Sequence, residues 1–552
     1  MRTFKIFALT AGAALVSASA MAQTPSPEAM LKLSQYNYSF GTARSAALGG
    51  AFTSLGADLA SMAINPAGLG MYQSSDVGFS PSVTSSTMKS NYGGFSASDS
   101  KTQFSVGNLA AAFNLYQGSG ALTSMTFGIG YSKLADFNNT SFAYNQGIGS
   151  SITEIFAERM NGVPVSIFNT DDPYRPFRQS LRIDQWGGGL AYQAHLLEPI
   201  NDKQYSPFGP SAQYPDRKGA LSETATVNPA MRRITTGSIG EYDFSGGFNF
   251  NNILYVGLTI GVQDVYLRSE NNYTETYNNN EYNLQRMNYV QRQRLSGTGV
   301  NFKFGAIVRP VPNLRIGVAV HTPTFISMEE EYIELLGADY KGTSPQGLID
   351  SPFAINNYNI NTPTRLLTGI SYTLPKVGLI SVDYERVWYN GMRLRNTGYW
   401  NVEEDTKNMI GDMYKAANNF RAGLELTPLQ NFYLRAGYAS YGDCTKTNVY
   451  STSANYPTIK SYQNYSAGLG YRFGHAYLDL TYIYTDYKYL GDDIFYYNEA
   501  GMQFPIQSGT IDYQQNRHTV TLTMGVRFCS GEKKNQIWSN KGEPNGPHFI
   551  MI

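Results

Sequence analysis

The stretch HTVTLTMGVRF occupies residues 518–528, and its residues alternate strictly in character. Val520, Leu522 and Met524 fall on one face, whereas the threonines between them fall on the other. Successive side chains of a strand point to opposite faces, so this stretch predicts a β-strand with one apolar face. The same alternation recurs along the chain, at residues 378–387, 420–427, 465–474 and 476–486.

The links between such segments differ sharply in length. Short links lie at 251–252, 311–313, 375–377, 429–431 and 475. Long polar links alternate with them, at 268–296, 324–364, 390–417, 441–463 and 487–517. Outer-membrane barrels have short turns at one end and long extracellular loops at the other. A large soluble all-β protein has no reason to segregate loop length in this way, so the pattern favours the barrel.

Counting the segments predicts an all-β fold, a 14-stranded antiparallel transmembrane β-barrel over residues 76–528. A further strand-like segment, 184–194, is assigned to a long extracellular excursion, about 134–235, because including it would break the segregation of link lengths and the even strand number. Helical spacing of apolar residues predicts short helices at 150–160 and 404–417, which either form an apolar groove above the barrel or pack the loops together. The expected strands are 76–84, 103–114, 123–133, 236–250, 253–267, 297–310, 314–323, 365–374, 378–389, 418–428, 432–440, 464–474, 476–486 and 518–528.

The composition fits a barrel and excludes several function classes. The chain has 42 Tyr, 29 Phe and 54 Gly, only 15% charged residues and a mean hydropathy of −0.31. Its formal net charge of zero gives no electrostatic reason to expect nucleic acid as a partner. The five His are scattered without metal-ligand spacing, and no phosphate loop or nucleophile elbow is present. We therefore expect no metal, no cofactor and no enzymatic activity.

The two ends of the chain carry export and topology signals. Arg2 and Lys5 precede an apolar run, and Ala20-Met21-Ala22 is a cleavage pattern, so residues 1–22 read as a signal peptide. Residues 529–552 follow the last strand as a periplasmic C-terminal tail. Cys444 is expected in an extracellular loop and Cys529 on the periplasmic side. About 25 Å of membrane would separate the two thiols, so they should not form a disulfide.

Residues 23–75 do not read as membrane strands. They contain the small-residue runs GTARSAALGGAF at 41–52 and ADLASMAINPAGLG at 57–70. Eight strands fill their own barrel, whereas 16 or more leave an aqueous channel. Fourteen lie between, so a compact segment of this length can plug the lumen.

These runs resemble the hatch of the FadL/TodX-type outer-membrane transporters of long-chain fatty acids and aromatic hydrocarbons. The resemblance extends to LRIG at 314–317 with HTPT at 321–324, and to FRAGLELT at 420–427 with LRAGY at 434–438. The tail after residue 528 departs from the family, whose chains usually end with the barrel. The resemblance implies that residues 23–75 form an N-terminal hatch and that hydrophobic compounds cross by passive, hatch-gated diffusion. It implies gating roles for Asn65, Pro66, Ala67 and Gly68.

The resemblance also implies sideways release of cargo near an inward kink of a wall strand, for which Pro81 is one candidate. Charged residues on the lumen face either line a ligand path or pair with each other across a wet lumen. They are Arg309, Arg315, Asp383, Glu385, Arg421, Glu425, Arg435 and Arg472.

The expected partners are a hydrophobic small molecule, outer-membrane lipid and lipopolysaccharide, and the barrel assembly machinery, with the protein itself a monomer. Three alternatives to the transporter stay open. Some family relatives are outer-membrane partner or assembly proteins of a secretion system. The others are a general porin and a haem uptake protein.

Overall fold

The computed structural model describes residues 25–168, 181–207, 221–280, 284–342, 347–446, 458–497 and 506–528. The expected signal peptide, Cys529 and the 529–552 tail lie outside these residues.

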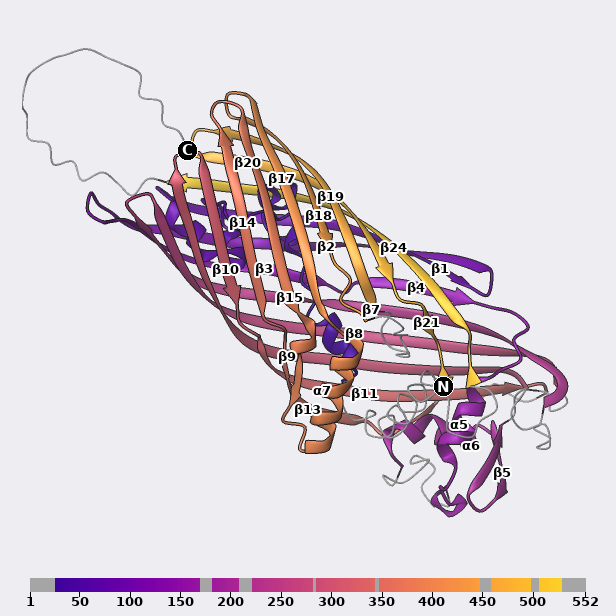
Figure 1. The fold of residues 1–552 in the computed structure, drawn as a ribbon. Helices are drawn as coiled ribbons and strands as arrows, with labels where there is room; N and C mark the ends of the chain where they lie inside the picture. The colour runs from indigo at the N-terminus through magenta and orange to yellow at the C-terminus, as the bar shows by residue number, and fades with distance from the viewer. Residues whose placement is uncertain are drawn as a thin grey trace, which may run out of the picture.

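Fourteen antiparallel strands close into a barrel, as the sequence predicts (Figure 1). Each strand pairs with the next, and the first pairs with the last, from Ser75↔Phe528 to Tyr92↔Ile511. In wall order the strands are β1 (Ser75–Tyr92), β2 (Phe95–Gln117), β3 (Leu122–Asp136), β7 (Leu221–Phe250), β8 (Leu254–Asn280), β9 (Leu284–Val311), β10 (Leu314–His321), β14 (Arg365–Leu374), β15 (Gly378–Trp388), β17 (Ala416–Leu429), β18 (Phe432–Tyr441), β19 (Ile459–Phe473), β20 (Ala476–Tyr489) and β24 (Thr510–Phe528).

The two faces of the wall follow the alternation of the sequence. On β24, Val520 and Met524 are 44% and 43% exposed on the outside, whereas Thr521 and Thr523 are buried on the inside. The exposed large apolar side chains come from every strand of the wall, and together they are called the apolar belt here. Within the described part of the chain, no helix is both long and apolar enough to cross a membrane.

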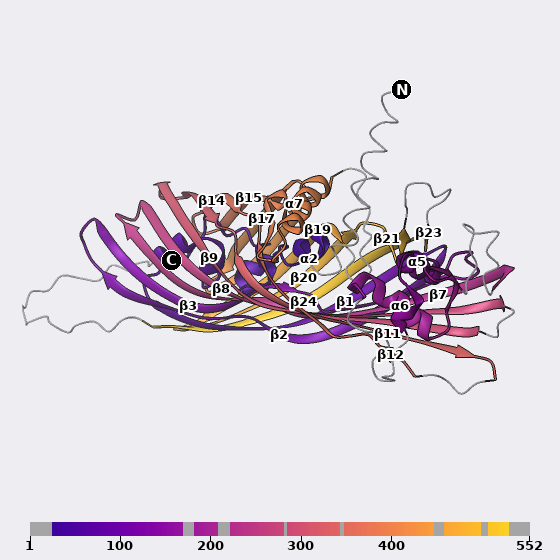
Figure 2. The same cartoon turned by 90° about the horizontal axis from the view of Figure 1, so that it is seen from below.

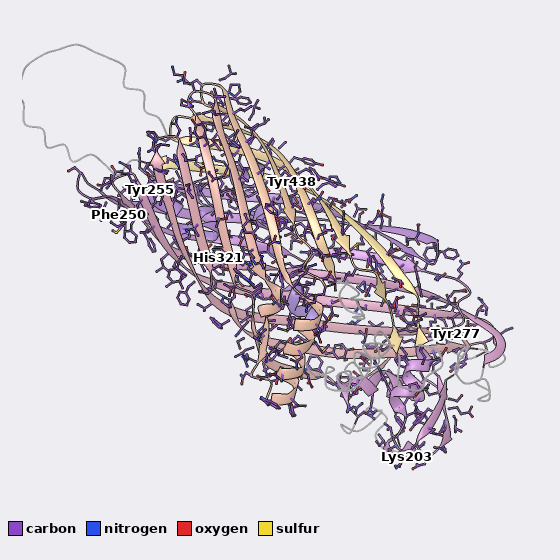
Figure 3. The ribbon with its side chains drawn as sticks, in the orientation of Figure 1. Lys203, Phe250, Tyr255, Tyr277, His321 and Tyr438 are labelled. Atoms are coloured by element: carbon purple, nitrogen blue, oxygen red, sulfur yellow. The ribbon has the colours of Figure 1, made fainter. Side chains whose placement is uncertain are left out.

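One end of the barrel, the turn end, has the expected short connections. Asn251 and Asn252 join β7 to β8, and Lys376 and Asn431 lie in two other turns, all with positive φ. Asparagine tolerates this left-handed conformation better than most residues, which suits it to tight hairpins. Figure 3 places Phe250 and Tyr255 at the turn end, and Tyr277 and Lys203 at the opposite loop end.

The prediction of a long loop at 268–296 is wrong, because β8 and β9 continue through most of it. These strands have 27 and 28 residues, whereas β14 has 10. About ten tilted residues already span the apolar band of a membrane. The extra length still alternates, but with polar residues on the outer face. A polar outer face suits a strand that extends into water beyond the bilayer. The polar residues of 268–296 therefore resemble a loop in the sequence, although most of them form strand.

The extended strands make a trough that continues one side of the barrel at the loop end (Figure 1). β1 and β2 join it through a two-residue turn at Gly93 and Gly94, so short connections are not confined to the turn end. Part of the expected 324–364 loop is also strand and pairs with β9. The trough and its neighbours include β4 (Asn139–Tyr144), β11 (Phe325–Tyr340), β12 (Ile349–Asp350), β13 (Ala354–Asn361) and β16 (Arg393–Arg395).

Two of the loop helices lie where helical spacing predicts them. They are α5 (Ile152–Met160) and α7 (Trp400–Met413). The strand-like segment 184–194 belongs to the loop end as expected, but it forms α6 (Trp186–Gln193). Gly187 and Gly188 allow α6 to approach α5, since a Cβ there would lie 2.6 Å from Phe156 Cε1 and 2.5 Å from Met160 Cγ. The remaining short elements are η4 (Val165–Phe168), η5 (Ile183–Gln185), η6 (Tyr389–Gly391), β5 (Leu197–Asn201), β6 (Gln204–Pro207), β21 (Asp492–Asp493), β22 (Tyr496–Tyr497) and β23 (Ile506–Gln507).

The described residues before β1 fold inside the ring of strands, and Figure 2 shows α2 within it. Their backbone is a series of short helices rather than strands. Caps fix several of these helices; Ser26 caps α2 and Thr42 caps α3 through their side-chain oxygens. The elements are α2 (Pro27–Lys32), η2 (Tyr38–Phe40), α3 (Ala43–Ala47), α4 (Ser61–Ile64) and η3 (Pro66–Met71).

Cys444 lies at the loop end, but its side chain is only 1% exposed. It packs in an apolar cluster with Met30 and Leu33 of the N-terminal segment. Burial raises the pKa of the thiol to about 12. We therefore expect a membrane-impermeant maleimide to leave Cys444 unmodified on intact cells and to label it after denaturation. Rapid labelling of the folded protein, measured by intact mass, would contradict this burial.

Candidate functional site

The hatch, whose described residues are 25–74, contacts every strand of the wall. Inward-facing glycines make this possible, because a Cβ at Gly257 would lie 2.3 Å from the Pro66 carbonyl carbon and one at Gly317 would lie 2.2 Å from the Thr53 oxygen. β15, β20 and β24 contact the hatch instead through hydrogen bonds of Asp383, Thr481 and Thr523. The wall glycines at which an added Cβ would lie close to hatch atoms are Gly78, Gly107, Gly128, Gly130, Gly247, Gly257, Gly305, Gly317, Gly369, Gly423, Gly437 and Gly468.

Asn65 lies at the centre of the hatch–wall contact. Its Nδ2 donates to the Thr53 oxygen at 2.6 Å and to the Val318 oxygen of β10 at 3.3 Å. Its Oδ1 accepts from the backbone nitrogen of Ala67 at 3.1 Å and so caps η3. One side chain therefore joins two turns of the hatch to the wall.

Pro66 and Gly68 complete this tight turn. The Pro66 and Ala67 backbone lies against Gly257, so both residues are fixed by the wall. A Cβ at Gly68 would lie 2.6 Å from Ser61 Oγ, within the hatch itself. All four residues for which the family resemblance implies gating roles are fully buried.

Five of the predicted lumen-facing residues gather around the hatch. Asp383 accepts from the Thr53 backbone nitrogen at 2.8 Å. Glu425 accepts from Arg44 of the hatch at 3.0 Å and from Arg435 of the wall at 2.6 Å. Charge-assisted bonds of this kind are stronger than neutral ones. They hold the hatch in one position on the wall.

A second ion-pair group lies beside the first. Glu385 accepts from Arg421 at 3.0 Å and from Arg365 at 3.2 Å, with all three side chains buried. The Arg421 guanidinium also lies 5.0 Å from the centre of the Tyr38 ring of the hatch. Glu385, Arg421 and Arg365 are therefore paired with one another in this structure, and a role of the lumen-facing charges in a ligand path stays a prediction.

Arg309, Arg315 and Arg472 lie apart from this group, near the turn end, and are only partly buried. Arg309 Nε donates to the Pro312 oxygen at 2.9 Å. The Arg472 guanidinium packs between the rings of Tyr433 and Tyr477, 5.2 and 5.7 Å from their centres. The structure thus separates the eight residues into a hatch-contacting set and a set at the turn end.

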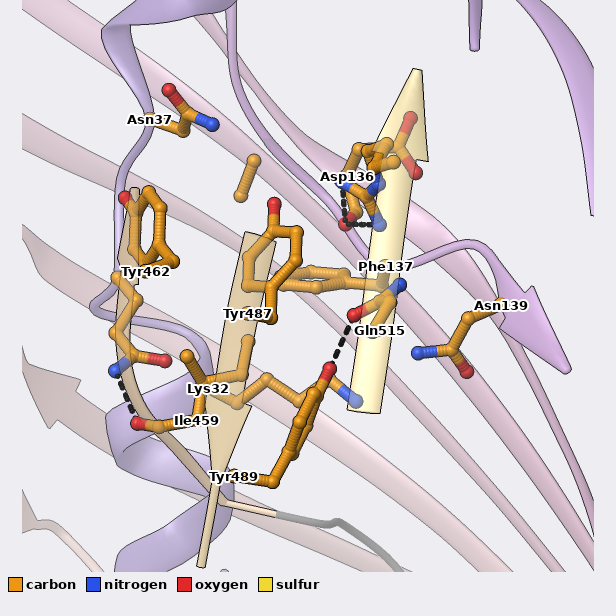
Figure 4. A pocket seen from close by; sticks show the side chains of 13 residues that line it. Lys32, Asn37, Asp136, Phe137, Asn139, Ile459, Tyr462, Tyr487, Tyr489 and Gln515 are labelled. Atoms are coloured by element: carbon orange, nitrogen blue, oxygen red, sulfur yellow. Dashed lines mark hydrogen bonds between the residues drawn. The ribbon is translucent and has the colours of Figure 1, made fainter. Parts of the chain in front are cut away.

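A luminal cavity of about 50 Å³ lies beside the N-terminal part of the hatch (Figure 4). Tyrosines from β19 and β20 line one side, and Phe137 lies opposite with Lys32 5.8 Å from its ring centre. Arg517 of β24 is 4% exposed and lines the same space. Its terminal nitrogens donate to the backbone carbonyl oxygen of Asp136, while its Nε has no hydrogen-bond partner among the described residues.

The sequence analysis missed Lys32 and Arg517. Arg517 falls one residue before the predicted start of the last strand, although its alternation with Tyr513 and Gln515 on the inner face continues the pattern. Lys32 lies in a short helix whose contacts depend entirely on its insertion into the lumen.

The wall is interrupted next to this cavity. The β2–β3 ladder stops at Asn108↔Ser132, and the described residues show no pairing of the β2 segment 95–107 with β3. The β1–β2 register shifts between Ser80 and Pro81 and omits Gly107. A Cβ at Gly107 would lie 2.5 Å from the Phe40 oxygen of the hatch. The bulge at Gly107 and Pro81 therefore brings β2 inward, against the hatch, at the position named as a kink candidate.

A second cavity, of about 110 Å³, lies at the loop end. Its lining is mainly apolar and aromatic: Ile152, Ile155, Phe156, Met231, Tyr273, Tyr289, Ile494 and Phe495, with Arg159 and Gln291. Glu275 of β8 holds α5 over this space by accepting from the Ile152 nitrogen at 2.9 Å and from Ser151 Oγ at 2.5 Å. The helix is thus fixed to the trough through its N-terminus.

Docking of α5 is expected to depend on pH. Burial, together with Glu275 and Glu158, raises the pKa of Glu154 in α5 to about 8. An unfolded glutamate titrates near roughly 4.3, so the folded state binds the extra proton. The stabilising contribution is complete below about pH 4.3 and is lost as the pH rises through about 8. Hydrogen exchange in residues 152–160, corrected for intrinsic rates, should be faster at pH 9 than at pH 6.

The matched variant is Glu154→Gln, whose side-chain oxygen can still accept from Ser151 in the capping box. This variant should reduce the difference in hydrogen-exchange rate between pH 6 and pH 9. Part of the difference should remain, because burial also raises the pKa of Glu275. Equal protection of the native helix at both pH values would contradict the assignment.

Among the described residues, no three His, Cys, Asp or Glu side chains are grouped to hold a metal ion. The expectations of no metal and no cofactor stay predictions.

No family model and no curated protein matches the chain. Solved structures do. The chain is similar to outer-membrane channels of the FadL and TodX type. The P. putida toluene transporter TodX has 11% identity and a TM-score of 0.47, over 89% of this chain and 99% of its own. A Pseudomonas aeruginosa FadL homologue has 10% identity and a TM-score of 0.47, over 86% and 95%.

The Ralstonia pickettii toluene transporter TbuX has 14% identity and a TM-score of 0.45, over 88% of this chain and 98% of its own. At such identities and TM-scores these similarities establish no shared cargo.

Proposed function

We propose that the protein is an outer-membrane channel that imports hydrophobic molecules by passive diffusion, with the hatch as its gate. The observation that carries this proposal is the arrangement of two aromatic-lined cavities and an interrupted wall around a hatch that fills the lumen. The loop-end cavity has the largely apolar and aromatic lining that is typical of small-molecule sites, whereas charged and amide side chains make up about half of the luminal lining. In such a channel the loop end is extracellular and the turn end is periplasmic.

The path has three stages. Cargo first enters the apolar cavity under α5, then reaches the luminal cavity beside Lys32 and Arg517. Movement of the N-terminal part of the hatch then frees Phe40 from Gly107, next to the place where the β2–β3 ladder has stopped. Cargo leaves there, sideways, without crossing the polar contacts around Asp383 and Glu425. Asn65, Pro66, Ala67 and Gly68 keep the rest of the hatch fixed.

The luminal cavity favours an amphiphile with an acidic head over a neutral hydrocarbon. Lys32 and Arg517 both line it, and the nearby Asp136 carboxylate is already paired with Lys133. A carboxylate can accept from Arg517 Nε, which a hydrocarbon leaves unsatisfied. Tyr462, Tyr487 and Tyr489 offer apolar ring surface to the chain next to the head. The long-chain fatty acid type of cargo therefore fits better than the aromatic hydrocarbon type.

The remaining parts follow from the same proposal. Residues 1–22 direct export and are removed, 23–75 form the hatch, 76–528 the barrel, and 529–552 a periplasmic tail. The barrel assembly machinery inserts the chain as a monomer among outer-membrane lipid and lipopolysaccharide. The protein performs no catalysis.

The test is equilibrium binding of radiolabelled palmitate and of toluene to the purified full chain in detergent. Arg517→Gln should weaken palmitate binding about tenfold or more, since a hydrogen bond to a charged group is worth roughly 1.5–3 kcal/mol. Toluene binding should change little. Arg472→Gln is the matched control, because Arg472 packs on tyrosines near the turn end instead.

Three outcomes would contradict the proposal. Rapid sugar flux through the intact protein in liposomes would favour a general porin. Binding of neither ligand, with uptake in cells unchanged on deletion of the protein, would favour a partner or assembly protein of a secretion system. Tight haem binding in place of palmitate would support haem uptake.

A further inference from the structure

Two arginines face each other on the outer surface of the trough. Arg268 of β8 and Arg294 of β9 are direct cross-strand partners, with side chains 56% and 47% exposed. Like charges placed directly opposite in a sheet repel each other and destabilise it. The pairing is therefore costly unless an anion lies between the two guanidinium groups.

The acids within 4 Å of this pair lie closer to Arg294 and to a neighbouring arginine, Arg292, than to Arg268. Arg294 Nη1 lies 3.1 Å from Glu331, but the nearest carboxylate oxygen to Arg268, on Glu270, is 3.9 Å away. Glu270 lies closer to a third arginine, Arg292, at 3.1 Å. Within 4 Å, the three arginines thus have two carboxylate partners, and Arg268 has the more distant one. Asp264 and Glu329 lie exposed on the same outer face. On the other flank the cross-strand partner of Arg268 is Thr236, which carries no charge.

The pair lies just beyond the apolar belt. On β8 the outward side chains of Leu258, Ile260 and Val262 are apolar, and Asp264, Tyr266 and Arg268 follow on the same face. Tyrosines at this position mark the membrane–water interface of barrels. The Arg294 guanidinium lies 5.8 Å from the centre of the Tyr266 ring, so this long side chain leans back toward the belt.

We propose that Arg268 and Arg294 form a site for a phosphate group of a phosphorylated glycolipid in the outer leaflet. Guanidinium groups bind phosphate through paired charge-assisted hydrogen bonds, and basic clusters next to the apolar region bind lipid head groups. A bound phosphate removes the repulsion between the two arginines and anchors the trough to the membrane surface. The site rests on the outer-membrane placement proposed above, but not on the cargo.

The test measures binding of diphosphoryl lipid A to the full chain in detergent by native mass spectrometry. Arg268→Gln with Arg294→Gln should lower the affinity about tenfold or more. The control is Arg286→Gln. Arg286 lies on β9 farther from the apolar belt than Arg294, its side chain is as exposed as that of Arg268, and it is paired with Asp339 at 2.7 Å. That variant should bind as the native protein does. Heat-modifiable migration on gels checks that all barrels are folded.

The ligand controls identify the source of the phosphate. Lipid A without its phosphates should bind the native protein no better than diphosphoryl lipid A binds the double variant. Equal binding of both lipids, or equal binding by the double variant and the native protein, would overturn the site. Displacement by equimolar inorganic phosphate would overturn the glycolipid as its ligand. Palmitate binding by the same samples separates these results from failure of the proposed transport, since the double variant should bind palmitate normally.

Discussion

A chain that lacks residues 41–70 is expected to form an open pore. These residues contact the wall around its whole circumference, so their removal empties the lumen between Gly257, Gly317 and Gly437. A 14-stranded wall is wide enough to leave a passage once nothing fills it. Planar-bilayer recordings should show conductance about tenfold or more above the native protein, together with sugar flux in liposomes.

The deletion also removes partners from Asp383 and Glu425, so the barrel must be shown to remain folded. Heat-modifiable migration and a native-like β-sheet signal are the necessary controls. A folded deletion variant that stays closed to sugars would contradict the role of this segment as a plug.

Alanine at both Gly257 and Gly305 is the second change with a large expected effect. These glycines are cross-strand partners on neighbouring strands, and both lie against the Asn65–Ala67 turn. A Cβ at Gly257 would lie 2.4 Å from the Ala67 nitrogen, and one at Gly305 would lie 1.8 Å from Asn65 Oδ1. The first contact is with backbone, which has no flexible end to move aside. The hatch must therefore shift as a body.

The double variant should reach the membrane but leak small sugars about tenfold faster than the native protein. Gly120→Ala is the matched control, because nothing lies within 4 Å of the added Cβ. Faster sugar leakage through the Gly120→Ala variant would contradict close packing of the hatch against the wall. So would unchanged sugar leakage through the folded double variant.

The strand count and faces of the barrel could be predicted because alternation is a local property. Val520 and Thr521 differ in polarity, and this difference alone assigns them to opposite faces. Strand length was not predictable in the same way. Beyond the bilayer an outer face is polar, so residues such as Arg268 and Asn272 read as loop although they continue β8.

The site was predictable only in part. The small-residue runs at 41–52 and 57–70 indicate a hatch. The structure shows that the wall supplies the matching glycines, Gly247, Gly257 and Gly305, in one cross-strand row. Their alignment depends on register between strands far apart in sequence, which one sequence does not reveal. The pairing of Arg517 with the Asp136 oxygen is equally non-local.

The closed ring around the hatch has a consequence for biogenesis. The hatch directly precedes β1, yet β1 completes the ring by pairing with β24, the last strand of the chain to be synthesised. Because wall atoms contact the hatch on every side, the hatch cannot enter the lumen after β1 has paired with β24. Contacts so distant in sequence also form slowly, because a long loop must close first. We therefore expect the hatch to be in place before β24 pairs with β1, and a chain truncated before residue 510 to leave the barrel open.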